Sequence, residues 1–121
     1  MRYTLEHDDT IATLILHEDR LDSDVGAEFK AEIMLHAQSG IEALLVDMAE
    51  VMHCDSAGVS AMLFAHRAMK SAGGATIFVG MAPTVEAILN VAQLDNVLYL
   101  YPTREEALAD LAGDGSEDEL E

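Results

Sequence analysis

Residues 43–63 read ALLVDMAEVMHCDSAGVSAML, and this stretch decides the fold. Its first four residues form an apolar run with almost no alternation, which is typical of a strand buried on both faces of a sheet. Its last residues place apolar side chains three and four positions apart, which indicates the buried face of a helix. The apolar positions of that helix are Val59, Met62, Leu63 and, beyond the stretch, Met69. The stretch therefore predicts a buried strand, a connection and an amphipathic helix.

The flanking sequence repeats this alternation. Residues 2–6 and 11–16 alternate around a turn-prone segment and predict a β-hairpin. Further strands are expected at residues 75–80 and 97–101, and further helices at 25–37, at 83–92 and from 103 onward. The order β-β-α-β-α-β-α-β-α predicts an α/β domain with a mixed sheet flanked by helices, since the hairpin is antiparallel and the crossovers are parallel. The expected core is Phe29, Ile33, Leu44, Leu45, Val46, Leu63, Ile77, Phe78, Val79, Ile88 and Leu89.

The chain length fits one domain, which we assign to residues 1–112. Residues 113–121 carry five acidic side chains and little to bury, so we expect an acidic, disordered tail.

The charge of the chain is strongly negative. Six Lys and Arg residues face 23 Asp and Glu residues, for a net charge of -17. Nucleic acids and anionic lipid surfaces repel such a chain, so neither is an expected partner. No apolar run approaches the roughly 18 residues that cross a bilayer, and the N-terminus does not look like a secretory signal. We expect a cytoplasmic protein that does not insert into membranes.

Catalysis and metal binding find little support in the residue pattern. The nucleophile pattern G-x-S-x-G is absent around Ser56, because Cys54 stands at its first glycine, and no spacing ties His53 to this serine. The five histidines show no metal-binding spacing. Residues 22–26 begin like a calcium loop, but Ile33 stands where the bidentate acid belongs. We expect no enzyme activity, no metal and no cofactor, and a serine hydrolase is kept as a rival.

The tetrapeptide Asp55-Ser56-Ala57-Gly58 opens the helix of the central stretch. Asp55 can cap this helix, which leaves Ser56 in its first turn, where backbone N–H groups are unpaired and the helix dipole is positive. A phosphate on Ser56 would add a charge of roughly -1.5 to -2 beside Asp55 and near the loop of Asp22. Such a change suits a switch that releases a partner. On the tetrapeptide alone, an Asp-Ser pair that only caps the helix is the preferred explanation.

The central stretch, from Leu45 to Leu63, resembles the signature of STAS domains, which are shared by sulfate transporters and anti-sigma factor antagonists. Other landmarks of the family follow in order along the chain. They are Arg20-Leu21-Asp22, Ala72-Gly73-Gly74, Ala82-Pro83-Thr84-Val85 and Leu94-Asp95. The resemblance covers about residues 2–112.

The resemblance to the antagonists implies a regulatory function without catalysis. The serine of the family motif, here Ser56, is phosphorylated by a kinase that is itself the anti-sigma factor. The unphosphorylated form binds this kinase and frees the sigma factor, and a serine/threonine phosphatase restores the form that binds. The resemblance places Asp22, Asp55, Ala57 and Gly58 at the partner-binding surface. Any nucleotide at the interface belongs to the kinase.

Two other functions within the family remain open. One is a STAS scaffold subunit of a lipid-transport ATPase complex, and the other is a scaffold subunit of a stress-signalling assembly. The single-domain form and the intact Asp55-Ser56 pair favour the antagonist.

Overall fold

The computed structural model describes the backbone of residues 1–120 and the side chains of residues 1–112. The elements are β1 (Tyr3–Asp8), β2 (Ile11–Leu16), β3 (Arg20–Leu21), α1 (Ser23–Gln38), β4 (Ala43–Asp47), β5 (His53–Cys54), α2 (Ser56–Ser71), β6 (Ala75–Val79), α3 (Pro83–Val91), β7 (Tyr99–Tyr101) and α4 (Arg104–Leu120). The predicted α/β order is confirmed, and two short strands, β3 and β5, are added to it.

The main sheet is mixed, as expected. Its strand order is β1-β2-β4-β6-β7. The hairpin strands β1 and β2 pair antiparallel, while β2–β4, β4–β6 and β6–β7 pair parallel. The strands β3 and β5 pair with each other outside this sheet. Helical crossovers impose the parallel pairing, because a tight turn can join only antiparallel strands.

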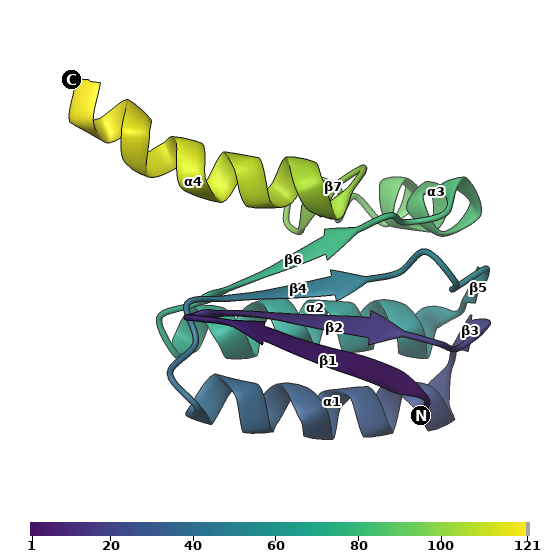
Figure 1. Cartoon of the computed structure of the whole chain (residues 1–121). Coiled ribbons are helices and arrows are strands. Elements are labelled where there is room, and N and C mark those ends of the chain that lie inside the picture. The colour runs from purple at the N-terminus through teal and green to yellow at the C-terminus, as the bar shows by residue number, and fades with distance from the viewer. Residues whose placement is uncertain (121) are drawn as a thin grey trace.

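Helices cover both faces of the main sheet. Figure 1 shows α1 and α2 on one face and α4 on the other. Strand β4 sends Leu44 and Val46 to the cluster under α1 and α2, and Ala43 and Leu45 to the cluster under α4. All four side chains are buried, which explains the absence of alternation in this strand.

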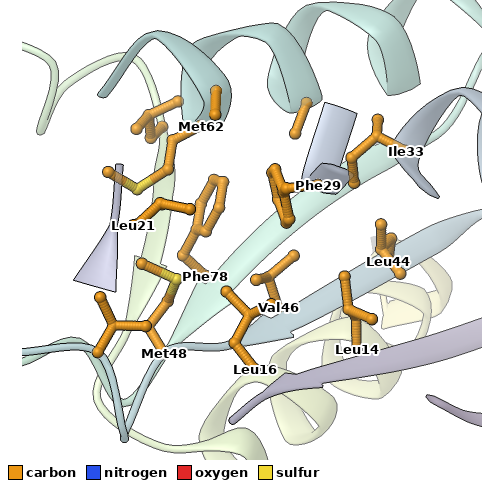
Figure 2. Close-up of a cluster of buried hydrophobic side chains, with 14 of the residues drawn as sticks. Leu14, Leu16, Leu21, Phe29, Ile33, Leu44, Val46, Met48, Met62 and Phe78 are labelled. Atoms are coloured by element: carbon orange, nitrogen blue, oxygen red, sulfur yellow. The ribbon is translucent and has the colours of Figure 1, made fainter. Parts of the chain in front are cut away.

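The larger core cluster lies between the sheet and the helices α1 and α2. Figure 2 shows side chains from α1, α2, β3 and the strands of the sheet meeting there, among them Phe29, Met62, Leu21 and Phe78. All four are fully buried. Leu21 belongs to the two-residue strand β3, so this short strand is anchored in the core.

Two residues of the expected core are placed differently. The expectation for Ile88 was wrong, because its side chain is 38% exposed. Helix α3 turns Val85 and Leu89 inward instead, and Ile88 lies beside them on the outer side. Leu63 is only partly buried, because Met62 takes the inward position on α2.

The last helix begins as predicted. The Thr103 hydroxyl accepts a hydrogen bond of 3.1 Å from the backbone N–H of Glu106. On the inner side of α4, Ala107 is buried and Leu111 packs against the same cluster. The helix continues to Leu120, through most of the acidic segment. The side chains from residue 113 onward and Glu121 lie outside the described part, and the tail assigned to residues 113–121 stays a prediction.

Candidate functional site

A short parallel pairing places the first turns of α1 and α2 side by side. Strand β3 pairs with β5, so that Arg20 lies opposite His53 and Leu21 lies opposite Cys54. Both helices begin at the end of the molecule where these strands lie (Figure 1). The sequence pattern predicted only a connection where β5 lies and gave no sign of β3, since two residues show no periodicity.

Each short strand is followed at once by an aspartate that caps a helix. The Asp22 carboxylate accepts hydrogen bonds of 3.1 Å from the backbone N–H groups of Asp24 and Val25. The Asp55 carboxylate accepts one of 3.0 Å from the N–H of Gly58. The capping role expected of Asp55 is therefore confirmed. Two negative charges lie at the positive ends of two adjacent helices, where the dipoles favour them.

Ser56 is the first residue of α2, and it is exposed. Within the described residues its hydroxyl forms no hydrogen bond, and neither a histidine nor a carboxylate contacts it as a base. The N–H groups of the first helical turn are partly unpaired, so this position tolerates added negative charge. The geometry offers a free hydroxyl that an external enzyme can reach.

Gly58 is buried against the strand that leads into α1. A Cβ atom on this residue would lie 2.2 Å from the Leu21 carbonyl oxygen and 2.6 Å from the Cys54 sulfur atom. Only glycine allows α2 to begin so close to β3. Ala57 is half-buried. The structure thus brings Asp22, Asp55, Ser56 and Ala57 to one end of the molecule, with Gly58 beneath them, and their contact with a partner stays a prediction.

Two hollows lie at this end of the molecule, and Ser56 lines the second of them. One, of about 260 Å³, lies between the short strands and α3 and is lined by both Asp22 and Asp55. The other, of about 510 Å³, lies between α2 and α3, and its lining includes Ser56, Val59, Ile88 and Val91. The Val91 side chain is 86% exposed. Exposed apolar side chains grouped beside a polar site indicate a binding surface. The sequence pattern did not indicate this groove, because the helical spacing of Ile88 predicted a core position for it.

Among the described residues, neither the Cys54 thiol near Ser56 nor a metal centre supplies further chemistry at this site. Burial raises the pKa of the Cys54 thiol to about 11, and the neighbouring Asp55 carboxylate adds to the shift. A thiol with this pKa stays protonated at neutral pH and is a poor nucleophile. In the part of the chain that the structure describes, no group of three or more His, Cys, Asp or Glu side chains is arranged to hold a metal ion.

Comparison with known families decides what kind of domain this is. A model of the STAS domain matches residues 3–107. The chain belongs to the STAS domain family. No curated protein matches this STAS domain in a sequence search.

Solved structures share the fold of this STAS domain. The unphosphorylated anti-sigma factor antagonist SpoIIAA superimposes with a TM-score of 0.77 and 23% identity, over 93% of this chain and 97% of that one. The phosphorylated form of the Bacillus cell fate determinant SpoIIAA gives a TM-score of 0.70 and 21% identity, over 91% of this chain and 99% of that one. A sulfate transporter family protein from Wolinella succinogenes gives 0.75 and 14%, over 84% of each chain. Among the described residues of this STAS domain, none of the helices has the length and apolar character needed to cross a membrane.

Proposed function

We propose that this STAS domain is a cytoplasmic anti-sigma factor antagonist that binds an anti-sigma factor kinase and is released when Ser56 is phosphorylated. One observation carries the proposal. Ser56 is exposed at the first position of α2, and its neighbour Asp55 is fixed as the helix cap, beside the second capping carboxylate, Asp22. The likeness to an antagonist solved in a phosphorylated form supports the same function.

A phosphate at this position changes the surface and leaves the fold intact. The Ser56 side chain is in solvent, and the helix N-terminus stabilises negative charge in front of it. The new charge of roughly -1.5 to -2 stands beside the Asp55 carboxylate, which the Gly58 N–H holds in place. A partner that tolerates two carboxylates here meets a much stronger negative charge after phosphorylation. Repulsion and loss of close fit then release it.

The apolar groove next to Ser56 accounts for the attraction before phosphorylation. Ile88 and Val91 of α3 are exposed along this groove, and Val59 of α2 lines it. Burying such side chains stabilises a complex by roughly 25 cal/mol for each Å² of apolar surface removed from water. The charged switch and the apolar contact surface are adjacent, so one modification acts on the whole interface.

The proposal is tested with the protein as bait in extracts of its host, with and without phosphatase treatment, followed by assays with the captured kinase. Incubation with that kinase and ATP is expected to phosphorylate Ser56 and to abolish binding, and a serine/threonine phosphatase is expected to restore it. Ser56→Ala should bind constitutively, and Ser56→Asp should bind weakly, as measured by titration calorimetry. Ser39→Ala is the control, since Ser39 is an exposed serine at the C-terminal end of α1 and lines neither hollow at the Ser56 end; this variant should remain a substrate that is released normally.

Equal affinity of the kinase for the wild type, Ser56→Ala and Ser56→Asp would reject the switch. A scaffold subunit of a transport or signalling complex would then be the better description. Labelling of Ser56 by serine-directed covalent probes would instead favour a hydrolase.

A further inference from the structure

The exposed face of α2 that begins at Ser56 leads into a basic groove. Ser60, Arg67 and Ser71 follow Ser56 at intervals of four, seven and four residues, so all four lie on one side of the helix. Three of them, Ser60, Arg67 and Ser71, line one groove together with Lys30 of α1. This groove has a volume of about 370 Å³, and its lining also includes Phe64; we call it the basic groove.

The cations of the basic groove are left unneutralised in a chain with a net charge of -17. Arg2 and Arg104 form ion pairs with acidic residues of the chain. Within residues 1–112, neither Lys30 nor Arg67 forms one. The Lys30 ammonium lies 5.8 Å from the centre of the Phe64 ring, which orients it along the groove through a cation–π contact.

We propose that the basic groove is the docking site for an acidic segment of the same partner that binds at Ser56, and this rests on the proposed function. The face of α2 is then bipolar. At the Ser56 end the carboxylates of Asp22, Asp24 and Asp55 outnumber the Arg20 guanidinium. Lys30 and Arg67 make the other end positive. Arg67 lies eleven residues beyond Ser56, which corresponds to about 16 Å along a helix. A partner with basic groups for one end and acidic groups for the other binds in one orientation only.

This charge arrangement predicts how each end of the α2 face contributes to partner binding. Phosphorylation at Ser56 deepens the negative end and does not touch the groove. Complementary charges at the rim of an interface act mainly on the association rate and on its salt dependence. The basic groove therefore sets the rate and orientation of encounter, and Ser56 sets whether the complex persists.

The groove is tested directly by NMR with ¹⁵N-labelled protein and an acetylated peptide of eight glutamates, at 20 and 150 mM salt. We expect chemical-shift changes at residues 30, 60, 64, 67 and 71 that shrink at the higher salt. The double variant Lys30→Glu/Arg67→Glu should lose these shift changes. The neutral double variant Lys30→Gln/Arg67→Gln should weaken them, and it replaces the first variant if charge reversal perturbs folding. Absence of shifts in the wild type, or equal shifts in the double variant, would overturn the proposal.

A second arm uses the kinase identified by capture. Lys30→Glu/Arg67→Glu should slow its association about tenfold at low salt, with a smaller effect at high salt. Arg104→Glu is the control, because it reverses a cation at the first position of α4, on the opposite face of the sheet. An equal loss in Arg104→Glu, or no loss in the double variant, would overturn the groove even if Ser56 is the phosphorylated residue. If the peptide binds in the groove but the kinase does not phosphorylate Ser56, the proposed function is rejected, and the groove is still a docking site for an acidic segment.

Discussion

Gly58 of α2 lies directly against the carbonyl oxygen of Leu21, with no room for a methyl group between them. A Cβ atom there would be 2.2 Å from that oxygen, a distance that real side chains do not adopt. Because Leu21 is fully buried and paired with Cys54, the strand cannot move away without disturbing the core. This contact sets the start of α2, and with it the position of Ser56, against the start of α1.

The first prediction concerns this contact. Gly58→Ala should destabilise the protein by at least about 1–3 kcal/mol, because the added methyl group meets backbone atoms that cannot turn away. Gly26→Ala is the matched control, since a Cβ there meets its nearest neighbours at an ordinary 3.5 Å. That change should be neutral, or stabilising by up to about 1 kcal/mol. Urea unfolding measures both, and equal stability of the two variants would contradict the contact.

The second prediction separates the cap of Asp55 from its charge. Asp55→Ala should cost about 1 kcal/mol of stability, because the Gly58 N–H loses its acceptor. Asp55→Asn should cost less, since asparagine caps about as well as aspartate. If charge crowding drives release, phosphorylated Asp55→Asn should bind the kinase more tightly than the phosphorylated wild type, as calorimetry would show. Identical affinities of the two phosphorylated proteins would speak against charge crowding.

The third prediction concerns the buried side chain of His36. Its Nε2 atom has no hydrogen-bond partner among the described residues and lies 3.4 Å from a Glu32 oxygen. Burial lowers the pKa of His36 below its ordinary value of 6.5; the Glu32 carboxylate opposes this shift, and His7 adds to it. The unfolded chain then binds more protons than the folded one, so this histidine costs stability as the pH falls below about 6.5.

The comparison that isolates this effect is the free energy of unfolding of the wild type and His36→Leu between pH 7.5 and 5. The variant should show the shallower loss of stability on acidification, because leucine takes up no proton. Parallel curves for the two proteins would show that His36 is not the source of the acid sensitivity.

The fourth prediction concerns the C-terminal helix. Deletion of residues 113–121 should leave the melting temperature nearly unchanged, because Ala107 and Leu111 still cover the sheet. Deletion of residues 104–121 should lower it strongly, since Leu45, Ile77 and Val79 on the second face of the sheet would be uncovered. Thermal melting measures both variants. A large loss of melting temperature on deletion of residues 113–121 alone would show that the acidic segment docks on the domain.

The sequence by itself determined the layered architecture, because that information is local. The unbroken apolar run before Asp47 requires a strand buried on both faces, and the helical spacing of Phe29 and Ile33 requires one buried stripe. Capping chemistry is also local, so the starts of α2 and α4 were predicted at Asp55 and Thr103. The motif around Ser56 could be recognised for the same reason.

Only the tertiary structure decided what surrounds Ser56. The pairing of β3 with β5 joins segments more than thirty residues apart, and two residues carry no periodic signal, so Asp22 and Asp55 could not be placed in register from the sequence. Likewise Ile88 has the spacing of a core residue, and only the packing of α3 shows that Leu89 takes the inward position. Local pattern fixes which residues an element can bury, whereas the neighbours of a site follow from contacts between elements, which long-range packing alone selects.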